Sequence, residues 1–266
     1  MKDLSRRYPV WLCDVWGVIH DGHKPFATAV HALEQHRAHG GKVILITNAP
    51  RPKAIIEKSL DRIGVPRAAF DDMVTSGDVT RTLMMVHGGG QVFHLGPEQD
   101  LSLFEGLAIR RVPIAQAKAC VCIGLRDEYH EKPEDYLPLL REMKQHDLLM
   151  ICANPDKVVR KGKDLLPCAG ALADLYENIG GKVLMAGKPF APIYDLALER
   201  AGNPPRSSVL AIGDGPETDI LGAIQNSLAC VFISGGINAG PGAEEEVRQR
   251  YPQARIVHSM RELYWT

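Results

Sequence analysis

The sequence predicts an α/β fold, in which a doubly wound parallel sheet carries a second, inserted α/β unit. Short apolar runs rich in valine and isoleucine alternate along the chain with turn residues and helix-like stretches, which is the order of strand–helix–strand units. Most runs are continuously apolar, which is typical of strands buried on both faces of a parallel sheet. The expected strands span residues 10–13, 42–47, 91–95, 120–123, 148–153, 183–186, 209–212 and 229–233.

Turn and charged residues mark the ends of the expected helices. One helix is expected over 28–39, and another begins at Pro52 and ends before Gly64, because proline suits a first turn and glycine a helix end. Three glycines at 88–90 end a further helix before the strand at 91–95. Three glutamates at 244–246 are typical of a helix start, where acidic side chains complement the dipole.

The middle of the chain is expected to form a domain of its own. Residues 81–181 hold a separate series of strands and helices, long enough for a small domain. The chain after it resumes the strand–loop pattern of the first 80 residues. We therefore predict a core formed by 1–80 and 182–266, with 81–181 as an inserted α/β cap.

The charge balance excludes several classes of partner. Lysine and arginine number 31 and aspartate and glutamate 32, giving a formal net charge of −1. Such a chain lacks the positive charge that attracts nucleic acid or an anionic membrane surface. No apolar stretch reaches the roughly 18–20 residues that span a bilayer, and residues 1–10 do not resemble a secretory signal. We expect a cytoplasmic protein that binds neither nucleic acid nor membrane.

The cysteines and histidines do not predict a disulfide scaffold or a zinc site. Six cysteines are too sparse for a disulfide framework in a chain of this length, and we expect them to be buried, reduced thiols. On the helix at 28–39, His36 and His39 lack a third ligand at zinc-binding spacing. We expect these two side chains to be solvated.

Six polar residues stand at the ends of four predicted strands. The carboxyl ends of parallel strands are where α/β folds bind ligands. Carboxylates can attack phosphorus or hold a divalent cation, and a lysine can neutralise phosphate charge. The pattern therefore favours phosphoryl transfer. The residues are Asp14, Thr47, Asn48, Lys188, Asp214 and Asp219.

These segments, in this order, resemble the four motifs of the haloacid dehalogenase (HAD) superfamily of phosphatases, whose core is Rossmann-like. The matching segments are residues 14–19 (Asp-Val-Trp-Gly-Val-Ile), 46–48 (Ile-Thr-Asn), 187–189 (Gly-Lys-Pro) and 213–220, which begins Gly-Asp. The resemblance covers essentially the whole chain. Residues 154–156 (Asn-Pro-Asp) and the Gly-Lys-Pro segment are similar to the class IIA, NagD-like group in particular, whose cap lies between the second and third motifs.

The resemblance implies a role for each matching residue, with Mg²⁺ as cofactor and a small phosphorylated metabolite as substrate. Asp14 would be the nucleophile that forms an aspartyl-phosphate. Thr47 would bind a phosphoryl oxygen beside the Asn48 amide, and Lys188 would hold both the nucleophile and the phosphate. The metal site would combine Asp14, Asp214, Asp219 and the main-chain carbonyl of Trp16. Asn154 and Asp156 of the cap would face the substrate.

The first motif departs from the family at Trp16. The family has a second aspartate at this position, which protonates the leaving oxygen and later activates water. An indole has only an N–H donor and cannot do general acid–base work at neutral pH. Because such catalysis contributes about 10²–10⁴-fold to a rate, the substitution predicts slow turnover. Phosphate and metal binding are not affected, since the family uses only the main-chain carbonyl here for the metal.

Three residues are candidates to substitute for the missing aspartate, namely His20, Asp21 and Asp78. His20 lies in the loop after the first motif, and its ordinary pKa of about 6.5 suits acid–base work. The alternative is that His20 is a loop residue at the cap hinge. Asp78 follows Thr75-Ser76-Gly77 and is better interpreted as a helix N-cap or first-turn acid.

Three functional hypotheses are compatible with the sequence. The first is a Mg²⁺-dependent phosphatase of a sugar phosphate or nucleotide. The second is a degenerate phosphatase that binds a phosphorylated ligand, or keeps a stable phospho-Asp14, as a sensor. The third is a phosphotransferase, whose acceptor is not water. The apolar strands of the cap are also compatible with an interface in a homodimer.

Overall fold

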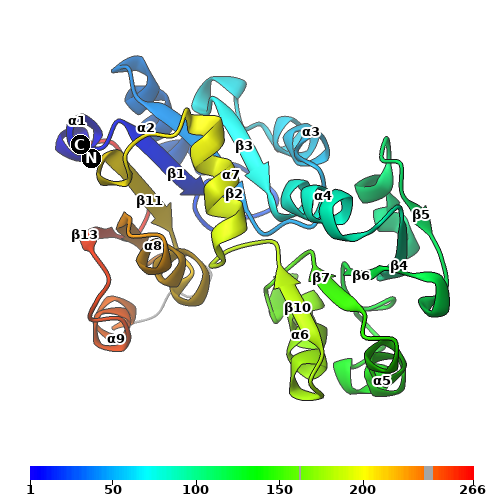
Figure 1. The fold of residues 1–266 in the computed structure, drawn as a ribbon. Helices are drawn as coiled ribbons and strands as arrows, with labels where there is room; N and C mark the ends of the chain where they lie inside the picture. Colours follow the sequence, from blue (N-terminus) through cyan, green and yellow to red (C-terminus); the bar gives the residue numbers. More distant parts are fainter. Residues whose placement is uncertain (162, 237–241) are drawn as a thin grey trace. The chain divides into compact units, whose positions relative to one another are not determined.

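The computed structural model describes residues 1–236 and 242–266 apart from 162 and divides them into two compact units (Figure 1). The core unit comprises Met1–Thr47, Ala54–Val74 and Lys188–Thr266, and the inserted unit comprises Asn48–Lys53 and Thr75–Gly187. The insertion thus starts at Thr75 and ends at Gly187, where the sequence places these boundaries at 81 and 181.

The core unit is built on a six-stranded sheet whose strand order is β13-β12-β11-β1-β2-β3. β1 pairs in parallel with both β2 and β11, and β11–β12 and β12–β13 are parallel as well. This is the predicted doubly wound α/β arrangement. The strands are β1 (Val10–Asp14), β2 (Lys42–Thr47), β3 (Asp72–Thr75), β11 (Val209–Gly213), β12 (Ala229–Ile233) and β13 (Ile256–Met260).

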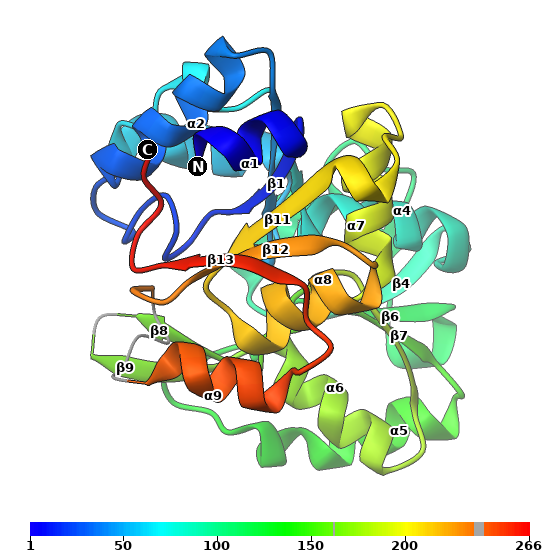
Figure 2. The same cartoon turned by 90° about the vertical axis from the view of Figure 1, so that its left-hand side faces the viewer.

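Helices cover both faces of the core sheet. Figure 2 shows α1 and α2 on one face and α7 and α8 on the other. The four strands β1, β2, β11 and β12 are therefore almost completely buried on both faces, which explains their largely apolar sequences. The helices are α1 (Lys2–Arg7), α2 (Ala27–Ala38), α3 (Lys53–Ile63), α7 (Ala191–Ala201), α8 (Leu221–Gln225) and α9 (Ala243–Arg250).

The inserted unit has its own parallel sheet, with the order β10-β7-β6-β4-β5. A separate antiparallel pair, β8 and β9, lies outside this sheet. The strands are β4 (Gln91–Leu95), β5 (Arg110–Arg111), β6 (Ala119–Cys122), β7 (Leu149–Cys152), β8 (Val158–Lys161), β9 (Asp164–Pro167) and β10 (Lys182–Met185). The helices are α4 (Ser76–His87), α5 (Leu137–Gln145) and α6 (Ala169–Asn178).

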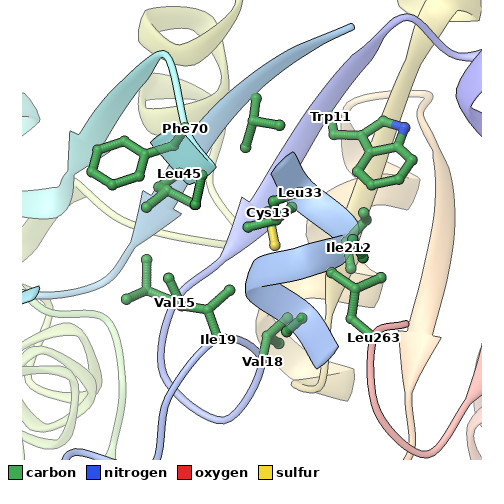
Figure 3. Packing of buried hydrophobic residues seen from close by; sticks show 14 of the residues in the cluster. Trp11, Cys13, Val15, Val18, Ile19, Leu33, Leu45, Phe70, Ile212 and Leu263 are labelled. Atoms are coloured by element: carbon green, nitrogen blue, oxygen red, sulfur yellow. The ribbon is translucent and has the colours of Figure 1, made fainter. Parts of the chain in front are cut away.

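Alternate residues of the core strands point to opposite faces. Trp11 and Cys13 of β1 pack with Leu45 of β2 and Leu33 of α2 on one face, as Figure 3 shows. The loop after β1 is anchored in the same cluster by Val15, Val18 and Ile19. This anchoring matters for the site because the loop begins directly after Asp14.

The cysteines agree with the sequence prediction. All six are buried and free of disulfide bonds. Burial raises the pKa of the Cys120 and Cys122 thiols, so they are held as neutral, poorly reactive groups.

His36 contradicts the expectation of a solvated side chain. It is fully buried, and its ring stacks on the Trp11 indole with the centroids 3.8 Å apart. Its Nδ1 shares a 2.7 Å hydrogen bond with the Ser5 hydroxyl. Gly41 makes room, since a Cβ there would lie 2.2 Å from the ring. His39, at the end of the same helix, is exposed as expected.

We predict that His36 makes the stability of the fold sensitive to acid. Burial lowers its pKa to about 4, whereas the unfolded chain titrates near 6.5. Between these values the unfolded state binds more protons, so the free energy of unfolding falls as pH falls, by up to about 3 kcal/mol. Urea titrations between pH 7 and pH 4 should show this loss, and His36→Gln should remove it. His31→Gln, an exposed position on the same helix, is the control and should leave the loss unchanged.

Candidate active site

The topology of the core sheet brings two acidic strand ends together. From β1 the chain adds β2 and β3 on one side, and later β11 on the other. The neighbouring strands β1 and β11 are therefore the switch point, where doubly wound folds bind ligands. Asp14 is the last residue of β1, and Asp214 directly follows β11.

Three buried carboxylates meet at this point. Asp14, Asp214 and Asp219 each offer an oxygen, and these atoms lie within 4.8 Å of one another. The Lys188 ammonium joins two of them, with Nζ donating to Asp14 Oδ1 at 2.5 Å and to Asp219 Oδ1 at 2.8 Å. The structure thus assembles four of the residues that the sequence singles out, from three separate segments of the chain.

The charges of this cluster do not cancel. Burial raises the pKa of the Asp14 carboxyl well above its ordinary value, and Asp219 and Asp214 raise it further, against the opposing effect of Lys188. Burial alone would lower the pKa of Lys188, but the nearby carboxylates outweigh it and raise that pKa. Three carboxylates and one ammonium carry a formal charge of −2 when ionised. A divalent cation would balance that charge, and hard carboxylate oxygens are the ligands that Mg²⁺ prefers.

Short backbone elements hold the acidic side chains in place. Asp219 lies on a single π-helical turn (Pro216–Ile220), and the Gly215 N–H donates to its Oδ2 at 3.0 Å. Two glycines are needed because the carboxylates come so close to the backbone. A Cβ at Gly213 would lie 2.1 Å from Asp219 Cγ, and one at Gly236 would lie 2.0 Å from Asp214 Oδ2.

Gly236 and Tyr194 contribute to the surroundings of the carboxylates but are not among the site residues predicted from the sequence. Tyr194 of α7 is buried, and its hydroxyl occupies the space that a Cβ at Gly222 would need. Burial and the nearby Asp219 raise the pKa of this phenol. A glycine pair after β12 is the available signal for Gly236. No sequence motif marks Tyr194, because its place beside Asp219 and Gly222 depends on contacts between distant segments.

The second motif is divided between the two units. Thr47 is the buried last residue of β2 and follows Ile46, the register partner of Asp14. Asn48, also buried, belongs to the inserted unit. Its Nδ2 donates to Asp156 Oδ1 at 2.9 Å. Asn154, the other predicted cap residue, accepts from the Asp156 N–H at 3.1 Å.

Trp16 is built into the loop that follows Asp14. Its ring meets His20 edge to face, with the centroids 5.3 Å apart. Gly22, with a φ of +90°, leaves space for the indole, because a Cβ there would lie 2.4 Å from two ring carbons. The indole Nε1 is buried, and the described residues offer it no hydrogen-bond partner.

The imidazole of His20 has one nitrogen that accepts a hydrogen bond and one that can only donate. Its Nδ1 accepts the Gly22 N–H at 2.8 Å, so the neutral ring carries its proton on Nε2. Burial lowers the pKa of this imidazole despite the nearby Asp21. Taking up a second proton would also break the bond to Gly22. The geometry therefore disfavours His20 as the base that would replace the missing aspartate.

Asp78 has the structural role expected of it. Its Oδ2 accepts the Thr75 N–H and its own N–H donates to the Thr75 hydroxyl, which together form a capping box at the start of α4. Its Oδ1 accepts the Lys53 N–H at 3.1 Å. Both oxygens are thus engaged by the backbone.

Comparison with known proteins identifies the family. A family model for haloacid dehalogenase-like hydrolases matches residues 11–110, and a HAD-hydrolase-like model matches residues 185–263. A solved haloacid dehalogenase-like hydrolase from Brucella suis is 42% identical, covers 99% of this chain and 98% of its own, and superposes with a TM-score of 0.87. The chain belongs to the haloacid dehalogenase-like hydrolase family. The predicted membership of the HAD superfamily is thereby confirmed.

Two further matches carry the name of a substrate or a metal. The D-glycerol 3-phosphate phosphatase of Mycobacterium tuberculosis is 26% identical over 270 residues, which is 99% of this chain and 73% of that protein. A glycerol phosphate phosphatase of the same organism, solved in complex with magnesium, is 22% identical. It aligns over 98% of this chain and 77% of its own and shares the fold, with a TM-score of 0.75.

Among the helices of the described residues, none combines the length and the apolar character that crossing a bilayer demands.

We predict that Mg²⁺ stabilises this HAD-like fold through the carboxylate cluster. A ligand present at about 100 times its Kd adds about 2.7 kcal/mol to the free energy of unfolding, which raises the Tm by about 5 °C or more. Thermal melts with EDTA and with Mg²⁺ measure the shift. Asp214→Asn should abolish it, whereas Asp195→Asn, an exposed acid on α7, should keep it. An undiminished shift in Asp214→Asn would place the cation elsewhere.

Proposed function

We propose that this protein is a Mg²⁺-dependent phosphatase of a small phosphorylated metabolite, such as a sugar phosphate or nucleotide. The observation that carries the proposal is the buried cluster in which Lys188 bridges Asp14 and Asp219 beside Asp214. The phosphatases among the relatives, one of them solved with magnesium, support both the reaction and the cation.

In the proposed reaction Asp14 attacks the phosphorus atom. A bond forms between a carboxylate oxygen and phosphorus while the bond to the leaving oxygen breaks, which gives an aspartyl-phosphate. Lys188 orients Asp14 and neutralises charge on the phosphoryl group. Thr47 and the main-chain N–H of Asn48 bind its oxygens. Mg²⁺, held by Asp14, Asp214, Asp219 and the Trp16 carbonyl, would draw negative charge away from the reacting phosphoryl group.

We assign the choice of substrate to the inserted unit. Most of it lies between the second and third motifs along the chain, which is the class IIA, NagD-like order, and it has a sheet and helices of its own. In this proposal the inserted unit acts as the cap. A cytoplasmic location and a homodimer formed through the apolar strands of this unit remain predictions.

A direct assay tests the proposed function. We expect steady release of inorganic phosphate from p-nitrophenyl phosphate, and faster release from a matching member of a sugar-phosphate and nucleotide panel. Release should require Mg²⁺ and should be lost in Asp14→Asn, since the amide cannot attack phosphorus. Asp195→Asn is the matched control. No release from any substrate by the wild-type protein would overturn the proposal.

A second candidate function is favoured by the surroundings of Trp16. Hydrolysis of the aspartyl-phosphate needs a base, and neither the Trp16 indole nor His20, with Nδ1 engaged by Gly22, offers a lone pair for this. A protein that keeps phospho-Asp14, or transfers its phosphoryl group to an acceptor other than water, would suit such a site. Its signature is one burst of nitrophenolate equal to the protein concentration.

We predict that restoring an acid at position 16 accelerates turnover. In Trp16→Asp the new carboxyl can protonate the leaving oxygen and then activate water, so kcat should rise by about tenfold to a hundredfold, within the range of general acid–base catalysis. Trp16→Asn has the same size without the acid and serves as the control. Equal kcat values in these two variants, both folded by circular dichroism, would show that the missing acid does not limit the rate.

A further inference from the structure

The loop that carries Asn48 is anchored in the inserted unit at four points, although it directly follows β2 of the core. One bond involves the Asn48 side chain, and the other three follow at residues 49, 51 and 53. The anchoring bonds are Asn48 Nδ2 to Asp156 Oδ1 (2.9 Å), the Gly77 N–H to the Ala49 carbonyl (3.1 Å), Arg51 to Asp100 (2.7 Å) and the Lys53 N–H to Asp78 Oδ1 (3.1 Å). The position of this loop is therefore set by the inserted unit.

Asp156 is itself held rigidly. Its N–H donates to Asn154 Oδ1 at 3.1 Å, and its carbonyl accepts the Gly170 N–H at 3.2 Å. The start of α6 presses against this turn so closely that a Cβ at Gly170 would lie 2.2 Å from the Pro155 carbonyl oxygen. The carboxylate is thus presented to Asn48 by a turn with little freedom to move.

The Asn48 side chain also touches the connection that leads to Lys188. A Cβ at Gly187 would lie 2.4 Å from Asn48 Oδ1 and 2.7 Å from Pro155 Cδ. Asn48 therefore lies between Asp156 and the residue that precedes Lys188. These side-chain contacts, together with the bond from the Gly77 N–H to the Ala49 carbonyl, restrict the main chain at residues 48 and 49.

We propose that Asp156 is a positioning residue that acts through Asn48, an inference that rests on the proposed phosphatase function. The carboxylate holds the Asn48 side chain, which aligns the main-chain N–H of Asn48 with a phosphoryl oxygen. This differs from the sequence expectation that Asp156 faces the substrate. A carboxylate next to a phosphate would repel it, whereas a carboxylate that accepts an amide N–H makes a strong, charge-assisted hydrogen bond.

A double-mutant cycle separates these two roles. Asp156→Ala and Asn48→Ala should each lower kcat/KM by roughly tenfold to a hundredfold, the equivalent of one hydrogen bond to a charged group. Because both remove the same bond, the double variant should lose no more than either single variant. Asp156→Asn, which keeps an acceptor oxygen, should recover most of the activity. Asp164→Ala, an exposed acid of the same unit, is the control.

The dependence on substrate gives a second readout. A residue that aligns a phosphate-binding N–H affects all phosphate esters alike, so the loss in Asp156→Ala should be the same for p-nitrophenyl phosphate and for a sugar phosphate. A residue that contacts the rest of the substrate would affect the sugar phosphate alone. Additive losses in the cycle, or a loss confined to one ester, would overturn the proposal.

Hydrogen exchange tests the same bond without relying on activity. Asp156→Ala should speed amide exchange in the peptide covering residues 48–53, and Asp164→Ala should not. Unchanged exchange in Asp156→Ala would refute the positioning role even in a fully active enzyme. Faster exchange in a protein without phosphatase activity would instead support the anchoring role and reject the proposed function.

Discussion

The bond between Lys188 and the two carboxylates of Asp14 and Asp219 is the interaction on which the site depends. It joins residues 174 positions apart, on either side of the inserted unit in the sequence, and it lies almost completely out of water. Removing one partner of a buried ion pair leaves an uncompensated charge, at a cost of about 3–5 kcal/mol. The end of β1, the segment after the insertion and the turn at 216–220 must therefore be correctly placed together, or the charges cannot be paired at all.

Close packing of the backbone around these charges explains several residues that have no chemical role. Gly213 and Gly236 have no Cβ at the places that the Asp219 and Asp214 side chains occupy. The carboxylates can therefore lie against the main chain of the neighbouring strand ends. Any side chain at these positions would push a ligand oxygen outward and widen the cluster. The glycines and the acidic residues therefore act together. The glycines determine how closely the three carboxylates approach one another, and this separation determines how strongly the cluster attracts a cation.

Much of the fold can be predicted from local patterns in the sequence. The features that could not be predicted depend on contacts between residues far apart in the chain. The strands β1, β2, β11 and β12 are largely apolar because helices cover both of their faces, and this signal is visible within each run. The prediction for His36 is wrong because its burial depends on Trp11 and Gly41, which neither helix periodicity nor composition connects with it. Asp156 belongs to a recognisable motif, yet its contact with Asn48 joins residues 108 positions apart. Contacts of this kind can be inferred only once the topology is known.

The residues around Trp16 leave a space that fits its indole ring. Gly22 adopts a left-handed backbone that most side chains avoid, and in doing so it leaves the space that the indole ring fills. The same residue donates its N–H to His20, which fixes the imidazole as a donor and sets it edge to face against the indole. Gly22 thus leaves space for the indole and engages Nδ1 of His20, so this nitrogen is not available as a base. In the proposed reaction, neither the Trp16 indole nor His20 can activate water, so hydrolysis of the aspartyl-phosphate is the step that we expect to be slow.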